Sequence, residues 1–132
     1  MLHTLWSLLI AVHGVISVMI SAGSTNPTGG TANPSWLSWW PTRLGQPWLL
    51  VQLGIAGRVP TLLVVLIGVA GGAALVLAGL GNLGVLVPQT AVRTLMGVGA
   101  AASLAVLVVF LHPFYAIGIL LNICVLIARR SV

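Results

Sequence analysis

Three polar side chains, His13, Ser103 and Asn122, stand inside long apolar stretches of the sequence. A polar group in such surroundings is costly unless it finds a hydrogen-bond partner, so these residues are the first candidates for a functional site. At a helical rise of about 1.5 Å per residue, His13 lies about 12 Å into its stretch, Ser103 about 13 Å into its own, and Asn122 about 9 Å from the end of the last. Helices running alternately up and down bring the three to a similar depth. We predict that His13 hydrogen-bonds Asn122 or Ser103 across helices; the alternative is that each bonds a carbonyl of its own preceding turn.

The residue inventory argues against ordinary catalysis. The chain has no Asp or Glu, so it lacks a carboxylate base, an acidic proton relay, a hard-metal ligand set and a group to orient a histidine beside a nucleophile. A haem held by two histidines fails on depth, because His112 lies about 13 Å from the level of His13 and His3 lies near the opposite surface. We expect no enzyme activity, no metal and no cofactor. A haem on a single histidine, or a bound quinone, is the remaining enzymatic alternative.

The composition is that of a membrane protein. Of 132 residues, 59% are hydrophobic and 4% are charged, whereas a soluble domain has about a quarter charged residues. A span needs about 20 apolar residues, so four spans and their loops account for the length. The sequence predicts an all-α, transmembrane four-helix bundle as a single domain. The predicted helices are residues 5–22, 59–81, 94–111 and 114–128, with turn-forming loops at 23–34 and 81–92.

A tryptophan-rich segment, residues 35–57, separates the first two predicted helices. Trp prefers the headgroup level of a bilayer, where its ring is apolar and its N–H stays wet. We predict an interfacial segment that includes a short surface helix capped by Ser35. The alternative is aromatic stacking on a carbohydrate or a flat cofactor. The tryptophans concerned are Trp36, Trp39, Trp40 and Trp48.

Small residues four apart mark the expected helix contacts. Gly68 and Gly72 form such a pair on the second predicted helix, and Gly97 and Ala101 form one on the third. Small side chains let helix backbones approach closely in lipid, where no hydrophobic force drives helices together. We predict packing within the chain through these faces; a homodimer contact is the alternative.

The five charges are all arginine and stand near the ends of the predicted helices. Flanking arginine anchors membrane spans, and its scatter argues against nucleic-acid binding. With four spans, Arg93, Arg129 and Arg130 share a side with both termini, against Arg43 and Arg58 on the other. This bias predicts a multi-pass protein of the inner (plasma) membrane with cytoplasmic termini. The first helix is expected to be retained, although a cleaved signal peptide is the competing interpretation.

The C-terminal hairpin carries a resemblance. The resemblance is carried by Arg93 to Leu104, His112-Pro113, Gly118 and Asn122, together with His13-Gly14 in the first helix. In these residues the chain resembles a widespread group of small, uncharacterised four-helix bacterial membrane proteins. In that group a second histidine often follows the first, where this chain has Ser17. The resemblance implies four helices and a bacterial membrane, and it brings no activity with it.

Two functions follow from these features. The first is a structural or accessory protein whose partners, besides the lipid bilayer, are subunits of a larger membrane complex or further copies of itself. The second is a carrier or pore for a small neutral or lipidic molecule, lined by His13, Ser103 and Asn122. The two differ in whether these polar residues satisfy one another in a dry core or line an open cavity.

Overall fold

The computed structural model describes residues 1–24 and 30–131, and within these ranges the chain is helical and has no strand. Residues 25–29 of the predicted first loop lie outside the described residues. The all-α prediction is confirmed. The main helices are α1 (Leu2–Gly23), α3 (Arg58–Asn82), α4 (Gln89–Val109) and α5 (Ala116–Ala128); the short elements are η1 (Ser35–Leu37), α2 (Trp48–Gln52), η2 (Pro113–Tyr115) and η3 (Arg129–Ser131).

Among the described residues, three helices are long and apolar enough to cross a membrane: α1, α3 and α4. The chain is therefore a membrane protein. The fourth apolar helix, Pro113–Ala128 with its opening turn, is shorter. Its 16 residues extend about 24 Å, against about 30 Å of hydrocarbon core. Of the four predicted helices, three are long enough to span, and the one predicted at residues 114–128 is a shorter apolar helix.

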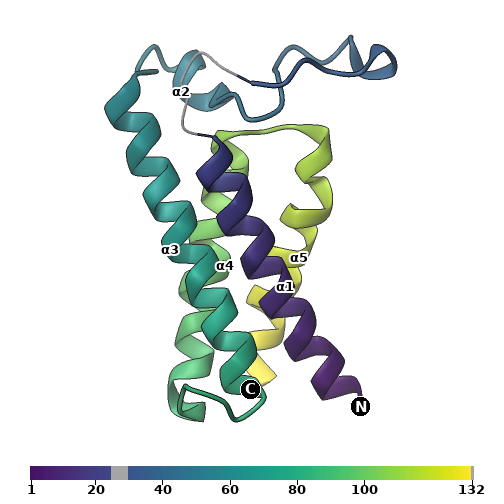
Figure 1. Ribbon diagram of the computed structural model, residues 1–132, viewed down its shortest axis with the longest axis vertical. Helices are drawn as coiled ribbons and strands as arrows, with labels where there is room; N and C mark the ends of the chain where they lie inside the picture. Colours follow the sequence, from purple (N-terminus) through teal and green to yellow (C-terminus); the bar gives the residue numbers. More distant parts are fainter. Residues whose placement is uncertain (25–29, 132) are drawn as a thin grey trace.

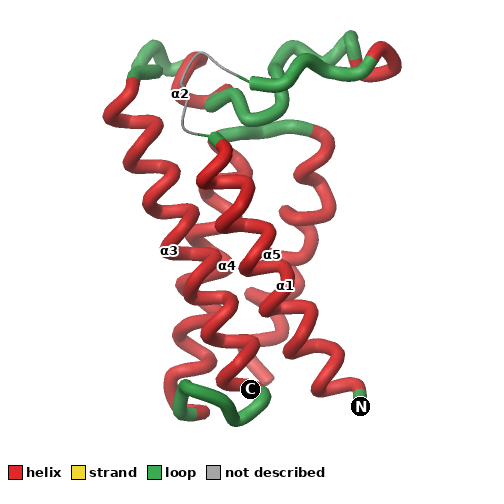
Figure 2. Tube along the Cα trace, viewed as in Figure 1, coloured by secondary structure: helices red, strands yellow, loops and turns green. Residues whose placement is uncertain are grey.

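The four main helices contact one another in the order α1, α3, α4, α5, and in the view of Figure 1 α3 lies at the left and α5 at the right. Helix α3 packs along both α1 and α4, and α5 packs on α4, but α1 and α5 touch at few points. The bundle is consequently open along its α1–α5 side. The N-terminus and the end of α5 lie at one end of it, and residues 30–57 cover the other end (Figure 2).

Glycine allows the close approach of α1 and α3. A Cβ atom on Gly72 would stand 2.7 Å from the carbonyl oxygen of Gly14, and one on Gly14 would stand 2.6 Å from the carbonyl oxygen of Gly72. Gly68 faces Ser21 further along the same pair of helices, while Gly71 faces α4. Helix α3 therefore packs against one neighbour on each of two glycine-bearing faces.

Residues 30–57, between α1 and α3, lie over the turn that joins α4 to α5. The segment folds back on itself through paired backbone bonds between Thr31 and Leu44, at 2.9 and 3.1 Å. The Trp-rich segment lies between the first two long helices, as predicted. The surface helix predicted to be capped by Ser35 is wrong: only the three-residue turn η1 begins there, after Pro34, and no side chain caps it. The proline holds an extended conformation that fixes the start of the turn.

The helix boundaries of the C-terminal hairpin also differ from prediction. Helix α4 begins at Gln89, not at residue 94, because extended Pro88 ends the loop and the Gln89 side chain donates to the Gly81 carbonyl at 2.8 Å. That bond satisfies a carbonyl at the end of α3, so the middle loop needs only residues 83–88. At the other end of the hairpin, η2 occupies Pro113–Tyr115 and α5 follows from Ala116.

Candidate functional site

A chain of hydrogen bonds joins three helices at mid-bundle. Ser17 Oγ of α1 donates to the carbonyl of His13 at 2.9 Å, which commits its hydrogen. Ser103 Oγ of α4 therefore donates to Ser17 Oγ at 3.0 Å. Asn122 Nδ2 of α5 donates to Ser103 Oγ at 3.2 Å and to the Gly118 carbonyl at 2.9 Å. This polar layer, made of Ser17, Ser103 and Asn122, is buried and connects α5 to α1 through α4.

The polar layer leaves two buried atoms without a hydrogen-bond partner among the described residues: His13 Nε2 and Asn122 Oδ1. The Asn122 amide lies close enough to the His13 imidazole to interact with it electrostatically, but the two do not reach hydrogen-bonding geometry. The structure thus brings Ser103 and Asn122 together and places His13 beside them. Of the two partners predicted for His13, the Asn122 amide acts on the imidazole, although their contact falls outside strict hydrogen-bonding geometry.

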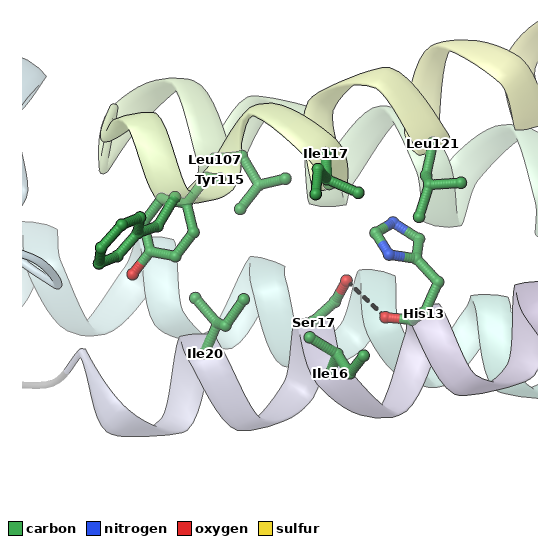
Figure 3. A pocket seen from close by; sticks show the side chains of 10 residues that line it. His13, Ile16, Ser17, Ile20, Leu107, Tyr115, Ile117 and Leu121 are labelled. Atoms are coloured by element: carbon green, nitrogen blue, oxygen red, sulfur yellow. Dashed lines mark hydrogen bonds between the residues drawn. The ribbon is translucent and has the colours of Figure 1, made fainter.

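The His13 imidazole points from α1 into the gap towards α5 (Figure 3). This gap is a groove with a volume of about 160 Å³, which we call the α1–α5 groove. His13 is only 5% exposed, so its ring forms part of the wall and is not solvated. The groove is lined by His13, Ile16, Ser17, Ile20, Leu107, Phe114, Tyr115, Ile117, Gly118 and Leu121. Its wall is apolar apart from His13, Ser17 and the Tyr115 hydroxyl.

Aromatic side chains close the groove at the end nearest the α1–α3 segment. Phe114 and Tyr115 line it there, and Trp36 of the covering segment contacts Phe114 with ring centroids 5.7 Å apart. His112 packs edge-on against both Phe114, at 5.1 Å, and Tyr115, at 6.1 Å. The loop between α1 and α3 is thereby coupled to the wall of the groove.

A second polar cluster, which we call the loop clamp, holds that segment in place through Asn33, Trp40, Thr42 and His112. The Asn33 amide donates to the carbonyls of Trp40 and Thr42, at 3.2 and 2.8 Å, so its oxygen is left to face His112 Nε2 at 2.9 Å. Thr42 Oγ1 accepts from Trp40 Nε1 at 2.7 Å and donates to the Leu111 carbonyl at 3.2 Å. The clamp joins the loop to the α4–α5 turn.

The loop clamp requires neutral His112. Its Nε2 must carry the hydrogen that Asn33 Oδ1 accepts, while its Nδ1 accepts from the Phe114 N–H at 3.3 Å. A proton added at Nδ1 would leave two donors facing each other. The side chain is 1% exposed, and this burial lowers the pKa of His112 below its ordinary value.

The tryptophans predicted to be interfacial divide into two kinds. Trp36 and Trp39 are 65% and 70% exposed, and no long helix covers them. Trp40 and Trp48 are partly buried, and Trp40 belongs to the loop clamp.

The two pairs of small residues also differ in what they contact. Gly68 and Gly72 both face α1, whereas Gly97 is covered by the guanidinium of Arg129 and Ala101 is exposed. Contacts within the chain thus occupy the first pair.

Sequence reasoning missed the structural roles of three residues: Ser17, Asn33 and His112. Ser17 stands one helical turn after His13, a spacing that places both on one face of a helix and is a usable signal. Nothing in the sequence links Asn33 to His112, which lie 79 residues apart.

No three His, Cys, Asp or Glu side chains gather into a potential metal site within the part of the chain that the structure describes. No family model, curated protein or solved structure matches the chain. The site must therefore be interpreted from its own geometry.

Proposed function

We propose that this membrane protein binds a small, largely apolar molecule in the α1–α5 groove and gives it a hydrogen bond at His13. One observation carries the proposal: a histidine that is 5% exposed lines an apolar groove, and its Nε2 has no partner among the described residues. A buried polar atom left unpaired costs about 1–3 kcal/mol. A ligand that supplies the missing partner, once the imidazole turns its buried Nε2 towards the groove, recovers that energy.

The open side of the bundle gives such a ligand a route. Because α1 and α5 touch at few points, the groove lies along the flank of the protein that lipid would cover. Exposed apolar residues such as Ile117, at 73%, border it. A molecule dissolved in the bilayer would reach His13 sideways, without crossing a polar surface. The groove has no charged side chain in its wall, so the ligand is neutral, and we propose binding or carriage without a reaction step.

The proposal is tested by analysing what the protein retains on purification. Wild type, His13→Leu and the matched control Val12→Leu are purified in mild detergent, and their apolar molecules are extracted and quantified by mass spectrometry. Val12 is 56% exposed and adjoins His13 on α1, so its substitution alters the lipid-facing surface and leaves the groove intact. A molecule present in wild type and control but depleted in His13→Leu supports the proposal. Identical extracts from all three proteins would overturn it.

An accessory role is the second candidate, and a separate surface favours it. A shallow, almost wholly apolar groove of about 410 Å³ runs between the outer faces of α1 and α3; it is lined by Val15, Val18, Met19, Ala73, Val76 and Leu77. A helix of another membrane subunit, or of a second copy, would fit such a surface. Pull-down of the tagged protein from its native membrane tests this role: subunits recovered in fixed ratio, and lost on Ala73→Trp, support it.

We also propose that the protein is a multi-pass protein of a bacterial inner membrane with its termini in the cytoplasm. Arg93, Arg129 and Arg130 belong to the end of the bundle that holds both termini, and Arg43 and Arg58 belong to the other end. The excess of arginine favours the cytoplasm for the first end. A reporter active only in the cytoplasm, fused after Val132, tests this orientation.

A further inference from the structure

We infer that the end of the bundle where α5 finishes binds the phosphate group of an anionic phospholipid through Arg93 of α4 and through Arg129 and Arg130 of η3. We call these three residues the arginine cluster. None of them lines the α1–α5 groove, so the inference concerns a second site and does not depend on the proposed function.

Packing brings arginines from two separate elements to one face of α4. Element η3 contacts α4, and the side chain of Arg129 covers Gly97: a Cβ atom on Gly97 would stand 3.1 Å from Arg129 Cζ and 3.4 Å from Arg129 Cδ. Arg93 lies one helical turn before Gly97, and residues four apart on a helix share a face, with Cβ atoms about 5–6 Å apart. Arg93 is exposed, so its long side chain is free to reach across this spacing. The two guanidinium groups can therefore hold one phosphate between them.

No side chain of the protein neutralises this charge. The sequence has five arginines and no Asp or Glu, so no acidic side chain faces Arg93 or Arg129. Arg129 is half-buried against α4. A charge that is partly removed from water and has no opposite charge beside it is costly. A bound anion removes that cost.

The short helix α5 makes the need for an anion sharper. Gly97 lies eight residues after Gln89, where α4 begins, so Arg129 meets α4 about 12 Å from the end of that helix. Arginine within the length of a spanning helix is expensive in hydrocarbon, and its cost falls where the bilayer thins locally to meet it. A lipid phosphate drawn to Arg129 supplies both the thinning and the opposite charge.

The surroundings favour a lipid over a soluble anion. Ile123 and Ile127, one turn apart on α5, are 41% and 66% exposed, and they lead along the helix to Arg130. Acyl chains can cover these side chains while the headgroup meets the arginine cluster. Guanidinium groups bind phosphate through paired hydrogen bonds, and basic pockets between membrane helices bind anionic headgroups. A zwitterionic headgroup would bring its own cation to a site that already holds three.

Lipid competition tests the inference. The purified full chain in detergent is mixed with equimolar phosphatidylglycerol and phosphatidylcholine that carry identical acyl chains, and bound lipid is counted by native mass spectrometry. We expect phosphatidylglycerol to be retained about tenfold more, the ratio that one charge-assisted interaction supplies. A parallel sample contains inorganic phosphate in excess over the lipid, and the lipid should stay bound.

Variants locate the binding. Arg93→Gln and Arg129→Gln should each reduce the preference to about threefold or less, and Arg129→Lys, which keeps the charge without the planar fork, should give an intermediate value. The matched control is Arg58→Gln, which removes the same charge from an exposed position at the other end of the bundle and should keep the full preference. Unfolding of each variant is measured alongside. Arg93 is exposed and is not the side chain that covers Gly97, so Arg93→Gln tests the site without disturbing the contact between η3 and α4.

Four results would contradict the inference. The first is equal retention of the two lipids by wild type. The second is a preference that Arg58→Gln lowers as much as the cluster variants do, since that is a response to net charge alone. The third is displacement of the lipid by inorganic phosphate, which would assign the site to a soluble anion. The fourth is the loss of a protein subunit from pull-downs of the cluster variants without any lipid preference in wild type, which would make a carboxylate of that subunit the opposite charge.

Discussion

Replacing Gly72 by alanine should force α1 and α3 apart. The added Cβ would lie 2.7 Å from the Gly14 carbonyl oxygen and 2.9 Å from the Val18 nitrogen, whereas ordinary contact begins at 3.4 Å. The helices must therefore separate locally by about 0.7 Å, because both obstacles are backbone atoms that no rotamer change can move. Overpacking of this kind costs about 1–3 kcal/mol. Higher helix propensity returns about 1 kcal/mol, so we expect a net destabilisation of up to about 2 kcal/mol.

The matched control is Gly23→Ala. Gly23 ends α1, and a Cβ placed there meets nothing within 4 Å, so its substitution should change stability by less than about 0.5 kcal/mol. Unfolding is followed in mixed micelles of increasing SDS content by tryptophan fluorescence, and the free energy of unfolding is compared across the variants. Equal free energies for Gly72→Ala and Gly23→Ala would refute the close packing of α1 on α3.

Three further outcomes are expected. A double-mutant cycle on Ser17→Ala and Ser103→Ala, measured by the same SDS unfolding, should give a coupling of about 0.6 kcal/mol, typical of hydrogen bonds inside membranes; additive effects would contradict the polar layer. Because burial lowers the pKa of His112, docking of the loop clamp should be complete above pH about 6.5 and weaken as the pH falls from there towards the lowered pKa; tryptophan fluorescence should show this change in wild type and not in His112→Gln. Gly97→Ala should cost less than about 0.5 kcal/mol in SDS unfolding, since the atoms in its way are the flexible end of Arg129. A cost equal to that of Gly72→Ala would show that the position of Arg129 is rigid.

The polar layer shows how much can be predicted from the depth of a residue along its helix. Depth along the helices suffices to place Ser103 and Asn122 at one level, and they are in contact. It does not fix the register of α1 to within one turn, and His13 and Ser17 lie one turn apart on the same helix face. Ser17 lies one turn further along and makes the contact, while His13 turns towards α5. A rise argument therefore fixes height only to about one turn, and the side chain that meets the next helix depends on how α1 packs against α3.

The covering segment shows what the sequence could not supply. Its proline, glycine and tryptophan content predicts an interfacial loop, and the segment does cover one end of the bundle. Its attachment to the α4–α5 turn depends on two single hydrogen bonds, one from His112 to Asn33 and one from Thr42 to Leu111, across 79 and 69 residues. No periodicity encodes such bonds, since they form only once the helices have brought the turn to the loop. The open α1–α5 side has the same origin, because it follows from which helices pack and not from their composition.

The most direct test of the central claim is a map of where a membrane-dissolved hydroxyl compound meets the protein. A dodecanol carrying a diazirine beside its hydroxyl is added to the protein in lipid bilayers, activated by light, and the modified residues are located by peptide mass spectrometry. Binding at His13 predicts labels concentrated on Ile16, Ile20, Ile117 and Leu121, with loss of that concentration in His13→Leu. Labels spread evenly over lipid-facing residues such as Leu63 and Leu66, unchanged in the variant, would contradict it.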